Sequence, residues 1–146
     1  MSKRLNIYLA GRMSGLTFDE MNKWRANTKS RLEKVASTTN TKVDVTNPVD
    51  FYNFMNPRHK NQKEIMQFDL MKVKSSDIVI VNLNGLNTSI GSCIECYEAW
   101  KKDIPVLAFG DDLTYENTHP WVKCCITRHD KNYKETIEYI KDFYMT

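Results

Sequence analysis

The stretch DIVIVN, residues 77–82, is the strongest strand signal in the sequence. Its four consecutive β-branched residues favour extended backbone, and they show no polar alternation that would mark a face open to water. A continuous apolar run of this kind is typical of parallel strands that are buried on both faces. The sequence therefore predicts an α/β fold in which helices cover both sides of this strand.

The segments on either side of this strand alternate between strand and helix patterns. Apolar runs and turn signals place strands at 5–10, 42–46, 77–82, 104–109 and, as an edge strand, 121–127, and helices at 18–35, 62–74, 90–102 and 131–144. Thr17 and Glu20 form the capping box that begins the first helix. This order predicts one domain over residues 1–146, an open parallel sheet of about five strands with helices on both faces.

The composition restricts the function classes and the location of the protein. The chain has 146 residues, of which 41% are hydrophobic, enough for the core of one domain. Its 21 basic and 18 acidic residues give a net charge of +3 without a long block of one sign, so we expect no polymeric nucleic acid as a partner. The apolar run at 7–10 is too short for a signal sequence or membrane span, and we expect a cytoplasmic protein with no membrane contact.

The four cysteines predict buried thiols rather than a metal centre. Cys93 and Cys96 form a C-x-x-C motif, but no second such motif and no neighbouring histidine accompanies it. Cys124 and Cys125 are adjacent, and on the expected edge strand their thiols would point to opposite faces. We therefore expect no metal.

Three segments should meet at one rim of the sheet, where open parallel sheets bind ligands. These are residues 8–15, residues 82–95, and the second helix near Asp69. Glu95 follows the helix start at Gly91-Ser92 by one turn, so its carboxylate can face the crevice. We expect Ile94, Trp100 and Tyr97 to pack on the sheet side of that helix. The alternative is that Glu95 and Asp69 are ordinary surface acids and Tyr8 an ordinary strand aromatic.

An ordered set of motifs resembles the nucleoside 2-deoxyribosyltransferase superfamily, including its deoxynucleoside 5′-monophosphate N-hydrolase-like members. The motifs are Ile7-Tyr8-Leu9-Ala10-Gly11, Asp69 ahead of Ser76-Asp77-Ile-Val-Ile-Val, Ser89-Ile90-Gly91-x-x-x-Glu95-x-x-x-Ala99, and Ile104-Pro105-Val106. They span nearly the whole chain. The resemblance implies a flavodoxin-like sheet.

The resemblance also implies an enzyme that cleaves the N-glycosidic bond of a (deoxy)nucleoside or deoxynucleoside 5′-monophosphate. Glu95 matches the family's nucleophile, which attacks C1′ of the sugar and forms a covalent sugar ester. Asp69 matches the acid that serves the leaving base, and Tyr8 matches a tyrosine that orients the nucleophile. The sugar then passes to water or to another base. This chemistry needs no cofactor.

The turn after the first strand and the start of the third helix are candidates for binding a phosphate. The glycines, the guanidinium and the hydroxyl of the turn Gly11-Arg12-Met13-Ser14-Gly15 suit a phosphate cradle. Ser89 stands where members acting on free deoxynucleosides carry an acid and the monophosphate hydrolases carry serine. With Gly91 and Ser92 it completes the candidate binding set, which favours a small nucleotide as substrate. A plain strand-to-helix turn is the alternative.

The chain departs from the family pattern at several positions. The order of Arg12 and Ser14 in the turn is reversed relative to the hydrolases, Tyr97 replaces a common glycine, and Cys93 replaces a small residue. These changes leave open a non-catalytic nucleotide-binding or sensing protein on the same fold. The segments His119-Pro120-Trp121 and Thr127-Arg128-His129 fall where family members donate residues to a neighbouring subunit, which implies a homo-oligomer, a dimer or a larger assembly.

Overall fold

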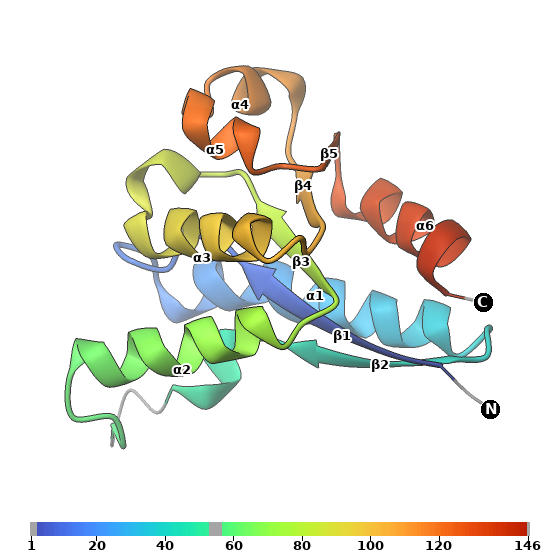
Figure 1. Cartoon of the computed structure of the whole chain (residues 1–146), viewed down its shortest axis with the longest axis horizontal. Helices are drawn as coiled ribbons and strands as arrows, with labels where there is room; N and C mark the ends of the chain where they lie inside the picture. Colours follow the sequence, from blue (N-terminus) through green and yellow to red (C-terminus); the bar gives the residue numbers. More distant parts are fainter. Residues whose placement is uncertain (1–2, 53–56, 146) are drawn as a thin grey trace.

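Five parallel strands form one sheet in the order β2-β1-β3-β4-β5, as the computed structural model shows for residues 3–52 and 57–145 (Figure 1). This confirms the expected α/β class, and the strand order is that of flavodoxin-like proteins. The strands are β1 (Lys3–Ala10), β2 (Thr41–Thr46), β3 (Ile78–Asn82), β4 (Val106–Phe109) and β5 (Arg128–Asp130).

Helices cover both faces of the sheet. On one face lie α1 (Phe18–Ala36) and α6 (Tyr133–Tyr144), and on the other lie α2 (Gln62–Lys74) and α3 (Ile90–Lys101). The β1 side chains alternate between these layers, because Leu5, Ile7 and Leu9 pack towards α1 and α6 whereas Tyr8 and Ala10 pack towards α3. The predicted capping box at Thr17 and Glu20 is present at the start of α1.

The expected edge strand at 121–127 is wrong. Its first part is the short helix α5 (Pro120–Cys124), which follows a second short helix, α4 (Asp112–Glu116), and the edge strand begins only at Arg128. Pro120 has the fixed φ that suits a first helical position, and His119 Nδ1 accepts a hydrogen bond from the Trp121 amide at 3.1 Å. Cys124 therefore lies on a helix, and the argument that placed its thiol on a strand fails.

The crevice of the fold opens between the ends of β1 and β3, where the chain switches direction. The chain leaves β1 through α1 on one face, and it reaches β3 through α2 on the other. The two layers therefore separate beyond Ala10 and Val81, which are register partners. Ligands bind at such switch points. No helix within residues 3–52 and 57–145 is long and apolar enough to cross a membrane.

Candidate active site

Glu95 and Tyr8 form a buried pair at the end of β1. Glu95 lies on α3 and is 8% exposed, while Tyr8 is fully buried on the side of β1 that α3 covers. The Tyr8 hydroxyl donates a hydrogen bond to Glu95 Oε2. Glu95 also lines two cavities at the rim of the sheet. The tyrosine therefore fixes one carboxylate oxygen of an acid that faces the crevice, and the surface alternative for Glu95 does not hold.

Burial raises the pKa of Glu95 to about 7. The hydrogen bond from Tyr8 and the charge of Arg25 lower this pKa, while the charge of Asp69 raises it. Burial and the neighbouring charge of Glu95 raise the pKa of Tyr8 far above its ordinary value, so Tyr8 remains a protonated donor at neutral pH. Glu95 can therefore change charge close to neutrality.

Replacing Glu95 by glutamine should stabilise the free protein at alkaline pH. A glutamine still accepts the Tyr8 hydrogen bond but buries no charge. The folded pKa of about 7 lies above the ordinary 4.5, so wild type loses about 3 kcal/mol of stability as pH rises through the folded value. Urea unfolding should show most of this difference between wild type and variant at about pH 8.5 and little of it at about pH 5. An equal difference in unfolding free energy at both pH values would contradict the raised pKa of Glu95.

Asp69 and Tyr52 form a second pair across the crevice. Asp69 lies on α2, and the Tyr52 hydroxyl, just after the short 3-10 helix η1 (Pro48–Phe51), donates a hydrogen bond to Asp69 Oδ2. Asp69 Oδ1 is buried and has no hydrogen-bond partner among the described residues. Burial raises the pKa of Asp69, against the lowering effects of the Tyr52 hydrogen bond and the charge of His59. The free oxygen is therefore the one available to a ligand.

Most of the predicted site residues line one cavity of about 280 Å³ together with Glu95 and Asp69. Its walls include Gly11 and Ser14 from the first turn and Ser89, Gly91 and Ser92 from the start of α3. A neighbouring cavity of about 360 Å³ shares Glu95, Asp69 and Gly91 and extends between α2 and α3. The two carboxylates therefore lie where the cavities join.

Arg12 is not among the residues that line this cavity. Its Nε donates to the Ser14 carbonyl at 3.0 Å, and its side chain lies against Gly15 and Gly85. A Cβ at Gly85, where φ is +70°, would lie 2.7 Å from Arg12 Cδ, so this packing requires glycine. Gly15 lines a separate cavity beside Tyr52 and His59. The predicted cradle is thus divided between two neighbouring hollows.

The start of α3 presents hydroxyl groups and uncapped backbone amides to the cavity. Ser89 stands at the N-cap but makes no side-chain capping bond, and its hydroxyl donates instead to Ser92 Oγ at 2.8 Å. Helix starts with free N–H groups favour anions. This end of the cavity can therefore accept an anionic group.

The predicted orientation of α3 is wrong for two aromatic residues. Tyr97 and Trp100 are 47% and 51% exposed on the outer side, with ring centroids 5.8 Å apart. Cys96 and Ala99 face the sheet instead, because small side chains allow the helix to approach β3 and β4 closely. Tyr97, which departs from the family pattern, is absent from the walls of both cavities that Glu95 and Asp69 line.

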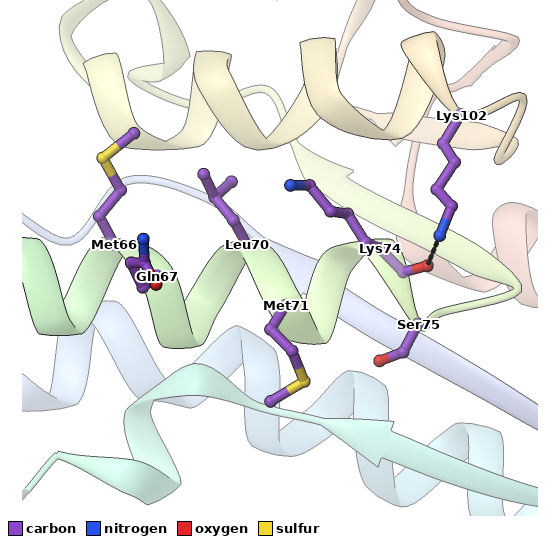
Figure 2. Close-up of a pocket in the computed structure, with 7 residues that line it drawn as sticks. All are labelled: Met66, Gln67, Leu70, Met71, Lys74, Ser75 and Lys102. Carbon is purple, nitrogen blue, oxygen red and sulfur yellow. Dashed lines mark hydrogen bonds between the residues drawn. The ribbon is translucent and has the colours of Figure 1, made fainter.

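A further cavity, of about 550 Å³, lies along α2 (Figure 2). Met66, Leu70 and Lys74 point towards α3, Met71 points away from it, and Lys102 Nζ donates to the Lys74 carbonyl at 3.2 Å. No carboxylate lines this cavity. It therefore lacks the acids expected of the active site. Within residues 3–52 and 57–145, no group of three His, Cys, Asp or Glu side chains is arranged to hold a metal ion.

The fold and the site define a parallel α/β protein with two tyrosine-held carboxylates at its switch point. The sequence profile of the family described as nucleoside 2-deoxyribosyltransferase matches residues 7–135. The chain belongs to this family, as the motifs predicted, and membership supports a deoxyribosyltransferase-type activity. A search of curated proteins finds no significant match.

Solved structures share the fold at low sequence identity. A conserved protein from Enterococcus faecalis V583 superposes with a TM-score of 0.75 and 19% identity, over 95% of this chain and 98% of that one. A 2-deoxyribosyltransferase from Bacillus psychrosaccharolyticus superposes with a TM-score of 0.60 and 17% identity, over 92% and 91% of the two chains. At these identities the likeness supports the fold.

Proposed function

We propose that this protein cleaves the N-glycosidic bond of a 2′-deoxynucleoside 5′-monophosphate through a covalent ester between the sugar and Glu95. The observation that carries the proposal is that the buried Glu95 and the half-buried Asp69 line one cavity, each with one oxygen held by a tyrosine hydroxyl. A nucleophile and an acid on opposite sides of a scissile bond are what glycoside cleavage requires.

In the first step the free oxygen of Glu95 attacks C1′ as the bond between C1′ and the base nitrogen breaks. The bonding electrons leave with the base, and a proton from Asp69 Oδ1 neutralises them. Burial shifts the pKa of Asp69 upwards, which is the direction that proton donation in this step needs. The anionic Glu95 stabilises the positive charge that develops on the sugar before the ester forms.

In the second step a nucleophile releases the sugar from Glu95. Water gives the deoxyribose 5-phosphate and makes the protein a hydrolase, whereas a second base gives a new nucleotide and makes it a transferase. Asp69 has just lost its proton and can accept one from the incoming nucleophile. No metal, redox group or other cofactor takes part in either step.

The start of α3 is the proposed site for the 5′-phosphate. Ser89 and Ser92 supply hydroxyl groups, and Gly91 belongs to the first turn, whose uncapped amides favour an anion. Ser14 and the Gly11 turn form the opposite wall. Arg12 does not line this cavity, because its Nε donates to the Ser14 carbonyl at 3.0 Å.

We also propose that the protein works as a homo-oligomer. Trp121 is 80% exposed on α5, in the segment where family members donate residues to a neighbouring subunit. The exposed aromatics of α3 add a second apolar surface. Chromatography with light scattering would measure the assembly, and a monomer at micromolar concentration would oppose this part of the proposal.

A substitution at Ser89 tests the proposed substrate. Aspartate at this position should reduce kcat/KM for 5′-monophosphates at least about tenfold, because a carboxylate repels the phosphate. Activity on free deoxynucleosides should change little or rise. The assay is chromatography of the released base from common deoxynucleotides and deoxynucleosides, with and without a second base as acceptor.

Three results, from this assay and from thermal unfolding with added nucleotide, would argue against the proposal. If the Ser89→Asp variant lost equal kcat/KM on monophosphates and on free deoxynucleosides, the start of α3 would not be the 5′-phosphate site. Bound nucleotide that stabilises the protein thermally yet remains intact would favour the non-catalytic binder. No released base from any common substrate would oppose the enzyme altogether.

A further inference from the structure

Arg25 is a fully buried cation that the proposed chemistry does not use. It lies on α1 and is 0% exposed, and it is one of the largest fully buried side chains. Charged side chains are almost never buried to this degree unless they are paired. Its surroundings must therefore contain the compensation.

The direct contacts of Arg25 are neutral. Its guanidinium donates to the carbonyl of Met21 and, at 2.8 Å, to the carbonyl of Gly11, and it stacks on the Trp24 ring at 4.6 Å from the centroid. Nε has no hydrogen-bond partner among the described residues, and none of their carboxylates forms an ion pair with this guanidinium. Two carbonyl bonds and one ring leave the charge itself unmatched.

The turn at Gly11 brings this cation to the crevice. Although α1 covers the face of the sheet opposite to α3, the bond to the Gly11 carbonyl places the guanidinium just past the end of β1. A Cβ at Gly11 would lie 2.6 Å from the Trp24 ring and 3.4 Å from the Arg25 guanidinium, so the close packing requires glycine. Gly11 also lines the cavity of Glu95 and Asp69.

We propose that Arg25 is the internal counter-charge of the carboxylates Glu95 and Asp69, and a positioning residue that anchors the Gly11 turn from below. The charged and titratable groups that act on it are Tyr8, Glu95, Tyr52 and Asp69, which come from β1, α3, the segment after η1, and α2. This buried cation thus acts on both acids, together with the charge of His59 at Asp69. Burial lowers the pKa of Arg25 to about 10, which leaves it charged at neutral pH.

The consequence is that Arg25 lowers the pKa of Glu95 and so favours its ionised form near neutral pH. Tyr8 and Asp69 also act on Glu95, and the next residue of the helix, Cys96, is buried beside it. Tyr8 donates a hydrogen bond and Asp69 adds negative charge, so among the residues that the structure describes Arg25 is the only cation that shifts the pKa of Glu95. For catalysis this inference rests on the proposed function, whereas the titration of Glu95 does not require turnover.

The test replaces Arg25 by methionine and follows the Glu95 carboxyl by carbon-13 NMR, assigned by its loss in Glu95→Gln. The titration midpoint of Glu95 should rise by about one pH unit or more. Arg31→Met is the matched control, since it removes an arginine two turns further along α1, and it should leave the midpoint unchanged. Arg25→Lys, which keeps a positive charge, should return the midpoint most of the way to its wild-type value. An unchanged midpoint in a folded Arg25→Met protein would overturn the proposal.

Unfolding measurements keep the proposal testable if Arg25→Met is unstable. Arg25→Met should cost less stability in the Glu95→Gln background than in wild type at about pH 8.5, and this difference should shrink at about pH 5. A purely structural arginine would cost the same in both backgrounds.

If the protein releases base, the acid limb of kcat/KM should move to higher pH in Arg25→Met, with roughly a tenfold loss below both midpoints. If the titration midpoint of Glu95 rises in Arg25→Met but the wild-type protein releases no base, the proposed function is rejected and the counter-charge is kept. Base release in which neither the acid limb of the kcat/KM pH profile nor the NMR midpoint of Glu95 moves would reject the counter-charge and keep the proposed function.

Discussion

Glu95→Gln should reduce base release by at least about a thousandfold. The amide has almost the same shape as the carboxylate and still accepts the Tyr8 hydrogen bond, so the crevice should stay intact. It cannot attack C1′, however, and it carries no negative charge to stabilise the developing cation of the sugar. The measurement is kcat/KM for base release at about pH 8, where wild-type Glu95 is ionised because its pKa is about 7.

Glu98→Gln is the matched control for this prediction. Glu98 lies one turn further along α3 and pairs with Lys101 at 3.3 Å and Lys74 at 3.8 Å near the surface. Surface pairs contribute little, so this variant should keep nearly full activity. Mass spectrometry of wild type quenched during turnover should also find one sugar phosphate attached to the peptide of Glu95. Residual activity above a tenth of wild type in Glu95→Gln would refute the nucleophile.

The sheet and its long helices could be predicted from the sequence because they depend on local patterns. The apolar run at 78–81 is continuous since β3 has neighbours on both faces and both edges, and the predicted helix at 62–74 coincides with α2. The capping box at Thr17 predicted the start of α1 correctly.

The region after β4 could not be predicted equally well. Residues 121–127 contain β-branched and aromatic side chains that suit a strand, but Pro120 and the His119 cap begin a helix there. α4 and α5 are only five residues long each, too short for a helical period to show in the sequence.

The acids of the site could be found from the sequence, but their partners could not. Glu95 and Asp69 occupy motif positions, whereas Tyr52 lies in a loop rich in aromatic residues, and no local pattern distinguishes it from Phe51 beside it. Arg25 occupies a helical position that sequence patterns assign to the polar face. Its burial depends on how α1 packs against the Gly11 turn, which is tertiary structure.

Asp69→Asn should reduce base release from an ordinary purine deoxynucleotide by about a hundredfold to ten-thousandfold, the usual range for loss of a general acid. Asparagine still accepts the Tyr52 hydrogen bond through its carbonyl, but it has no proton to give. The base would then leave as an anion. The measurement is single-turnover base release, and Asn61→Ala at the N-cap of α2 serves as a control for general weakening of that helix.

A substrate whose leaving base needs no proton distinguishes proton donation by Asp69 from general damage to the site. A purine deoxynucleotide methylated at N7 carries a positive base that departs neutral, so Asp69→Asn should lose less than about tenfold on it. Glu95→Gln should lose activity on both substrates, because the sugar still needs its nucleophile. Equal losses of Asp69→Asn on the two substrates would mean that Asp69 holds the sugar or the crevice and does not donate the proton. The free Oδ1, buried beside Glu95 with Oδ2 engaged by Tyr52, favours the unequal result.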